Sequence, residues 1–144
     1  NSGAKVELLI DAVVYHRRRT TLLKFFRQVF NWGVARINLG KADIAMLEPI
    51  HFFPSIVTLL SLLTVIGLVS YPSIFYPITI FGLIALLSIS IIGGMKTRSA
   101  VVLLLLLFVI PMQVLGYGLG FFIAFIKRFV LKHGEFTGFQ KKYY

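Results

Sequence analysis

Hydrophobic residues gather in the second half of the chain, in three long runs. These runs cover residues 52–70, 74–92 and 101–126, with a short break between neighbouring runs. A helix of about 20 apolar residues is long enough to cross the roughly 30 Å hydrocarbon core of a bilayer. The pattern therefore predicts a mainly α-helical integral membrane protein with about three transmembrane helices over residues 51–126.

The breaks and the small residues indicate how these helices connect and pack. Residues 71–73 are short and uncharged, which predicts a tight hairpin between the first two helices, and residues 93–98 interrupt the second run. The third run would be about 39 Å long as a helix. It is therefore expected to tilt, or to kink at Pro111. Gly116 and Gly120 have the small-xxx-small spacing that lets helices approach closely.

Residues 22–38 show apolar positions at helical spacing, upstream of the apolar runs. On a helical wheel one arc holds Leu22, Phe26, Val29, Phe30, Gly33 and Ile37, and the opposite arc holds Lys24, Arg27, Gln28, Asn31 and Asn38. This arrangement predicts an amphipathic interfacial helix, with its apolar side in the acyl boundary and its basic side toward headgroups. Thr20 or Thr21 can cap its start. Gly40, then Pro49, is expected to end it, so residues 19–50 form the helix and a hinge.

The first residues favour β-structure. Val6, Leu8 and Ile10 alternate with other residues in a way that suits a half-buried strand. An isolated pair of strands is marginal in water. Residues 1–18 are therefore expected to be the closing edge of a sheet whose other strands lie elsewhere. The first residue is Asn1 and no signal peptide precedes it, which leads us to expect part of a longer protein.

The net charge of +10 is concentrated around the apolar runs. Residues 1–50 hold eight Lys and Arg, the 93–98 break holds two, and residues 127–144 form a basic tail with five. Such patches contact anionic headgroups or fix topology. The candidate membrane-surface contacts are Arg17, Arg18, Arg19, Lys24 and Arg27. The positive-inside rule places residues 1–50 in the cytoplasm, but a third crossing would put the tail outside, against that rule, so the side of the tail stays open.

The residue types needed for several kinds of chemistry are missing. The apolar runs contain no Asp, Glu, Lys, Arg or His, which argues against a transporter or pump. The chain has five acidic residues and no cysteine, with no Asp-x-Asp pair, glycine-rich phosphate loop or His/Glu metal spacing. We therefore expect no metal or cofactor to be bound by this chain alone. The large apolar half also argues against nucleic acid as a partner.

A stripe of three residues is the main candidate for function. Gln28, Trp32 and Arg36 recur at i, i+4 and i+8 along one edge of the interfacial helix, with Arg36 at the flank of the apolar arc. One interpretation is that Arg36 snorkels and Trp32 anchors the helix at the interface. The other is that the stripe faces a protein domain and a charged ligand.

Three segments carry a resemblance to a known family. They are residues 3–8, residues 14–18 (Val-Tyr-His-Arg-Arg) and the pattern Arg27-Gln28 through Gly33 to Arg36. Together they resemble the end of the catalytic domain and the membrane junction of family-2 glycosyltransferases, inverting enzymes with a nucleotide-binding GT-A fold. Processive relatives, such as cellulose and hyaluronan synthases, carry a Gln-x-x-Arg-Trp motif on such a helix. Here Gln28 and Trp32 match that motif, Asn31 replaces its Arg, and Arg36 could supply the missing charge.

The resemblance implies a function that this chain would share with other residues. It implies a hexosyltransferase-type enzyme of a bacterial inner membrane that moves a sugar from a nucleotide-sugar donor to a lipid-linked or membrane-proximal acceptor. A divalent metal (Mg or Mn), the Asp-x-Asp that binds it and the base would lie upstream of Asn1. The donor- and acceptor-binding candidates are Gln28, Trp32, Arg36 and His16.

Two other functions remain open at this point. A small non-catalytic membrane subunit could use Gly116, Gly120 and its aromatic helix faces to pack against partner membrane proteins. A channel or flippase component is disfavoured by the lack of charged residues within the apolar runs. An upstream reading frame that encodes an Asp-x-Asp would support the enzyme.

Overall fold

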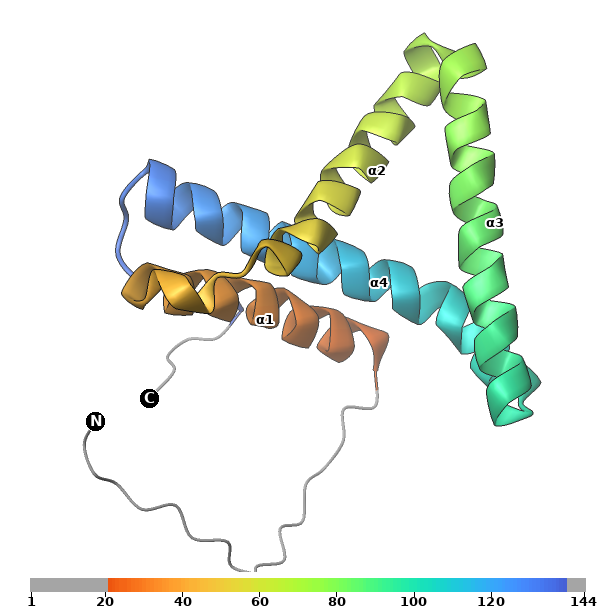
Figure 1. Ribbon diagram of the computed structural model, residues 1–144, viewed down its shortest axis with the longest axis horizontal. Coiled ribbons are helices and arrows are strands. Elements are labelled where there is room, and N and C mark those ends of the chain that lie inside the picture. Colours follow the sequence, from red (N-terminus) through yellow and green to blue (C-terminus); the bar gives the residue numbers. More distant parts are fainter. Residues whose placement is uncertain (1–20, 140–144) are drawn as a thin grey trace, which may run out of the picture.

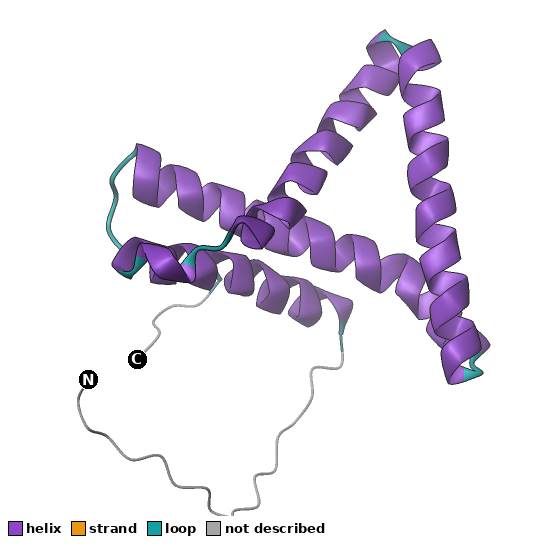
Figure 2. Cartoon of the chain, viewed as in Figure 1, coloured by secondary structure: helices purple, strands orange, loops and turns teal. Residues whose placement is uncertain are grey.

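The computed structural model describes residues 21–139, which form helices and their connections (Figures 1 and 2). The four long helices are α1 (Leu22–Ala42), α2 (Phe53–Ser70), α3 (Pro72–Thr97) and α4 (Ala100–Phe125). Short helical turns η1 (Ile44–Met46) and η2 (Pro49–Phe52) link α1 to α2, and a π-helical turn η3 (Ile126–Val130) follows α4. The predicted β remnant of residues 1–18 lies outside the described residues, and the described part contains no strand.

The long helices are arranged as a triangle with a fourth helix along its base. α2 and α3 meet at a sharp turn and diverge from it, and α4 joins their far ends (Figure 1). α1 lies beside the C-terminal half of α4, and this pair forms the most extensive helix contact of the described chain. The α1–α4 pair therefore forms the base of the triangle, and the α2–α3 hairpin projects from it.

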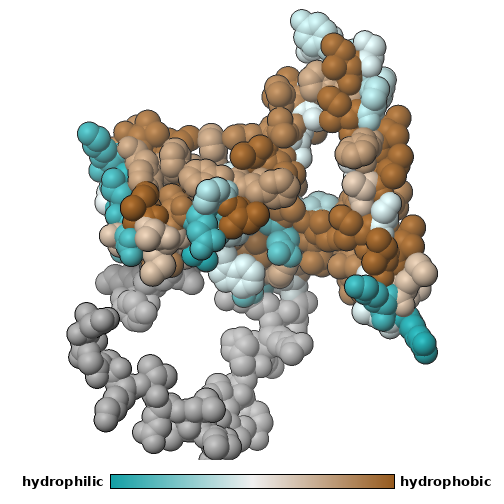
Figure 3. Space-filling model, viewed as in Figure 1, coloured by the Kyte–Doolittle hydropathy of each residue, from teal (hydrophilic) through white to brown (hydrophobic). Residues whose placement is uncertain are grey.

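Three segments are long and apolar enough to cross a membrane. They are Pro49–Ser70, Pro72–Thr97 and Ala100–Val130, as judged by length and composition. Their surfaces are apolar, and side chains such as Val69 (87% exposed) and Phe81 (74% exposed) point away from the protein (Figure 3). Exposed apolar surface on this scale needs lipid or another protein to cover it. The chain is a membrane protein.

Two predicted helix ends are wrong, because each helix continues through glycine residues that pack against a leucine of a neighbouring segment. α1 passes through Gly40, which lies against Leu47, and ends at Ala42. α3 passes through residues 93 and 94 and ends at Thr97. The stop is Arg98, which adopts the left-handed conformation (φ 50°), while the Ser99 N–H donates to the Gly94 carbonyl, as in a helix C-cap. Pro111 lies inside α4 and does not end it.

The apolar arc of α1 is buried against α4. Val29, Val34 and Ile37 are fully buried, as is Ala124 of α4, and Phe121 is 2% exposed. We expected this arc to lie in the acyl boundary. In the structure α4 covers it instead, so α1 is held by protein packing as well as by any membrane surface.

Glycines set the close approach of the two helices. A Cβ at Gly120 would overlap the backbone carbonyl of Phe30, and a Cβ at Gly116 would lie 3.2 Å from the Phe26 ring. On the other side of the contact, a Cβ at Gly33 would come within 2.6 Å of the Phe121 amide nitrogen. Only residues without a side chain let two backbones approach this closely.

The C-terminal segment, residues 131–139, returns along α1. The Asn38 side-chain amide donates to the Phe136 carbonyl (2.8 Å), and the Phe139 amide donates to the Asn31 side-chain oxygen (2.9 Å). The ring of Phe139 packs on the ring of Phe30, with a centroid separation of 4.8 Å. These contacts place residues 131–139 on the same side of the molecule as α1.

Candidate functional site

A groove of about 480 Å³ opens beside α1, where four elements meet. The lining comes from α1, from α4, from η2 and from the first turn of α2. Its lining residues are Val29, Trp32, Arg36, Ile50, His51, Pro54, Ile110, Gln113, Val114 and Tyr117. Half of these residues are aliphatic or proline, and the others carry N–H or O–H groups, so the groove is amphipathic.

Helical spacing explains why these side chains converge. Trp32 and Arg36 are four residues apart on α1, and so are Gln113 and Tyr117 on α4. Side chains four residues apart lie on one face of a helix, one turn above the other. Because the close contact of α1 with α4 fixes the rotation of both helices, the two pairs come together in the lining of the groove.

Arg36 lies where the groove meets the α1–η1 connection. Its Nη1 donates to the Met46 carbonyl at 3.4 Å, a long hydrogen bond, and its guanidinium interacts with the Tyr117 hydroxyl. The side chain is half-buried. A guanidinium has more N–H donors than these two contacts use, so Arg36 can still bind an anionic group bidentately.

His51 is fixed by the turn that carries it. Glu48 and His51 form a capping box around η2, in which the Glu48 amide donates to His51 Nδ1 at 3.0 Å. Because Nδ1 accepts this bond, the proton of the neutral ring is on Nε2. His51 therefore adds an N–H donor to the groove lining.

A second hollow adjoins the groove on the outer side of Arg36. It has a volume of about 290 Å³ and is lined by Trp32, Ala35, Arg36, Leu39 and Tyr117. Arg36, Tyr117 and Trp32 border both hollows, and Trp32 is 51% exposed. A ligand that binds Arg36 could therefore extend either along the apolar wall or out past Trp32.

The structure separates the residues of the predicted stripe. Trp32 and Arg36 line the groove, whereas Gln28 is half-buried one turn away and is not among the lining residues. Asn31 lies about 140° around α1 from Arg36. Its side chain accepts the hydrogen bond from Phe139, so Asn31 holds the C-terminal segment and does not face the groove.

The remaining predicted contact residues fall into two groups. His16, Arg17, Arg18 and Arg19 lie outside the described residues. Lys24 and Arg27 are exposed on α1, and the Arg27 guanidinium lies 5.6 Å from the centre of the Phe139 ring. Gly116 and Gly120 lie under α1 at its contact with α4, as described above.

Three polar residues of the groove were not predicted as site residues from the sequence: His51, Gln113 and Tyr117. The four-residue spacing of Gln113 and Tyr117 in an otherwise apolar run was a usable signal, because it places two polar side chains on one helix face. Nothing in the sequence indicates that this face meets Arg36. The position of His51 depends on the path of η1 and η2, which sequence patterns do not define.

The groove is lined by hydrogen-bond donors and apolar side chains but by no carboxylate. It therefore offers no carboxylate base. Among residues 21–139 no group of three or more His, Cys, Asp or Glu side chains is placed to hold a metal ion. The described residues therefore do not fit a divalent metal, and the groove offers a cation, N–H and O–H donors, and an apolar wall.

Comparison with known proteins gives no relative from which function could be transferred. No protein-family model, curated protein or solved structure matches the chain.

Proposed function

We propose that this chain is the membrane-anchoring, acceptor-side portion of a glycosyltransferase. The enzyme transfers a sugar from a nucleotide-sugar donor to a lipid-linked acceptor at the cytoplasmic face of a bacterial inner membrane. The proposal combines the resemblance of residues 3–36 to the membrane junction of family-2 glycosyltransferases with the amphipathic groove between α1 and α4.

The groove is the observation that supports the proposal, because its lining side chains suit a lipid phosphate. Arg36, with N–H groups still available, suits a phosphate, and His51 adds a further donor. The apolar wall of Ile110 and Val114 suits the first units of a hydrocarbon chain. Pockets that bind small molecules are mostly apolar with a few placed polar groups, and their volumes are about 300–1,000 Å³.

The groove lacks groups that sugar transfer requires. Binding of a nucleotide diphosphate needs a metal in GT-A enzymes, and an acceptor that reacts through a hydroxyl group also needs a base. The groove contains no carboxylate, and the described residues form no metal cluster. In this proposal the described residues hold and orient the acceptor, and the base and the metal belong to a catalytic domain outside them.

A transfer assay with two matched arginine variants tests the proposal. In membranes that contain the protein, transfer from labelled nucleotide sugars to polyprenyl phosphate is measured for Arg36→Ala and for Arg27→Ala. Loss of a charge-assisted hydrogen bond costs about 1.5–3 kcal/mol. This corresponds to a rise in KM for the lipid of about ten- to a hundredfold for Arg36→Ala. Arg27 lies on the other flank of α1 beside Phe139, so its variant should transfer at the wild-type rate.

Two outcomes would count against the proposal. A wild-type KM for the lipid in Arg36→Ala would show that the groove does not bind the acceptor. Equal losses in both arginine variants would indicate a general loss of positive charge at the membrane surface. Gln28→Ala is expected to leave the KM for the lipid unchanged, because Gln28 does not line the groove.

A second candidate is a non-catalytic membrane subunit, and the exposure of α3 favours it. Of the 26 residues of α3, only Ser90 and Gly94 are buried, so almost the whole helix is available to a partner. Purification in a mild detergent tests this candidate. A membrane protein that co-purifies in fixed ratio and is lost on Phe81→Lys, in a preparation without sugar transfer, would support the subunit over the enzyme.

A further inference from the structure

The basic residues of α1 indicate how this helix lies relative to the membrane surface. It carries Lys24, Arg27, Arg36 and Lys41, which are distributed along nearly its whole length of 21 residues. A crossing orientation would put at least one of these charges near the centre of the hydrocarbon, where cationic side chains are costly. A helix with one apolar face and basic residues along its length instead lies in the plane of the interface.

α4 follows the direction of α1 over its C-terminal half. Phe26 meets Gly116 and Phe30 meets Gly120, so a step of four residues along one helix matches a step of four along the other. The helices are therefore parallel and in backbone contact. Because α1 lies in the plane of the interface, this half of α4 lies parallel to that plane, on the side of α1 that faces the α2–α3 hairpin (Figure 1).

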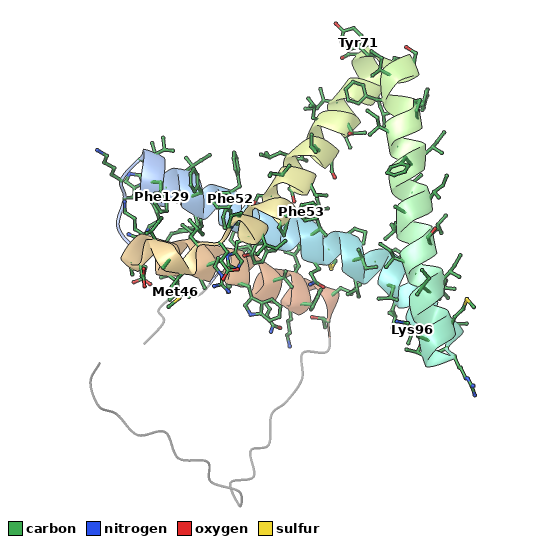
Figure 4. The ribbon with its side chains drawn as sticks, in the orientation of Figure 1. Met46, Phe52, Phe53, Tyr71, Lys96 and Phe129 are labelled. Atoms are coloured by element: carbon green, nitrogen blue, oxygen red, sulfur yellow. The ribbon has the colours of Figure 1, made fainter. Side chains whose placement is uncertain are left out.

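The two ends of α4 carry the same kind of residue. Lys96 and Arg98 precede its first turn, and Lys127 and Arg128 follow its last turn. In Figure 4, Lys96 and Met46 lie at the base of the molecule, whereas Tyr71 lies at the apex of the α2–α3 hairpin. Figure 3 likewise shows hydrophilic surface along the base and at the α3–α4 turn, with apolar surface over most of the hairpin.

The position of the C-terminal segment limits the number of membrane crossings. The side chains of Asn31 and Asn38 hydrogen-bond to the backbone at Phe139 and Phe136. A segment bound along α1 is on the same side of the membrane as α1. The chain between α1 and residues 131–139 must therefore cross an even number of times, and a full crossing by α4 after those of α2 and α3 would make the number odd.

We infer that α4 lies shallow in the membrane beneath α1, so that the chain crosses twice and presents its described basic residues to one anionic lipid surface. α4 is apolar over most of its surface and satisfies its backbone within the helix, so it tolerates this depth. The length of Ala100–Val130 would allow a crossing, but the contact with α1 decides the path of this helix. The arrangement also removes the conflict between a third crossing and the positive-inside rule.

Single cysteine residues test the arrangement, since the 144 residues contain no cysteine. Gly134→Cys reports on the C-terminal segment, and a Cβ there meets nothing within 4 Å. Lys96→Cys marks the base, and Ser73→Cys marks the apex of the hairpin, where both side chains are exposed. In sealed vesicles of known orientation containing the whole protein, a membrane-impermeant maleimide should label positions 134 and 96 from one side and position 73 from the other.

Depth measurement provides a second, independent readout. Spin labels are placed at Val101 and Gln113, two exposed positions twelve residues apart on α4. A crossing helix would bury position 113 about 18 Å deeper than position 101. The shallow helix predicts that both labels lie within a few Å of the same depth. Labelling of position 134 together with position 73, or the 18 Å difference in depth, would overturn the inference.

Discussion

Replacing Gly120 with alanine should separate α1 from α4. The new Cβ would overlap the carbonyl oxygen of Phe30 and lie 2.8 Å from its carbonyl carbon. Both are backbone atoms of a helix, so they cannot move as a flexible side chain can. The helices must therefore move apart, and the buried contacts of Phe121 and Ile37 weaken with them.

The expected cost follows from overpacking and helix propensity. Overpacking of a close contact costs about 1–3 kcal/mol. Alanine recovers about 0.5–1 kcal/mol relative to glycine within a helix. A net loss of about 0.5–2 kcal/mol corresponds to a two- to thirtyfold shift in the unfolding equilibrium.

The assay for this loss uses Trp32, the one tryptophan of the 144 residues, which lies on α1 beside the groove. Unfolding of the chain in mixed micelles is followed by Trp32 fluorescence as the fraction of SDS is raised. Gly82→Ala is the matched control, because a Cβ at Gly82 in α3 meets nothing within 4 Å. That variant should be as stable as the wild type or slightly more stable. If Gly120→Ala unfolds with the same midpoint as Gly82→Ala, the close α1–α4 contact is refuted.

Two further contacts should respond to single substitutions. Asn31→Ala removes the acceptor of the Phe139 amide and should raise hydrogen exchange of that amide about fivefold, as expected for loss of about 1 kcal/mol, whereas Asn31→Asp should keep it protected. Ser55→Ala removes the hydrogen bond from α2 to the Gly118 carbonyl and should lower stability by about 0.6–2 kcal/mol in the SDS titration. Ser88→Ala is its control, because Ser88 bonds only within its own helix, and equal losses in the two serine variants would contradict the assignment.

Local patterns predicted the helices well, because hydrophobic periodicity and run length act within a single helix. The amphipathic α1, the hairpin turn at Tyr71 and the three apolar helices all follow from such patterns. The ends at Gly40 and Gly94 were mispredicted, since each glycine is covered by a leucine from the following segment and the helix continues. Propensity alone does not contain that contact.

The candidate site was less predictable, because it depends on which helices meet. Trp32 and Arg36 were found as an edge of α1, but their partners His51 and Tyr117 come from segments 15 or more residues away. The role of Asn31 was also not visible, since its hydrogen-bond partner, Phe139, is 108 residues away. A groove between helices is a property of their packing, and sequence patterns indicate only its separate walls.

Photo-crosslinking of a lipid phosphate tests the central claim most directly. A photoreactive polyprenyl phosphate is bound to the protein in nanodiscs, and the labelled residues are mapped by mass spectrometry. The groove predicts labels on Trp32 and on the α4 wall from Ile110 to Tyr117, with a loss of about tenfold in Arg36→Ala and no loss in Arg27→Ala. Labels spread equally over exposed helix faces such as Val69 and Phe81, or labelling of the groove unchanged by Arg36→Ala, would contradict the claim.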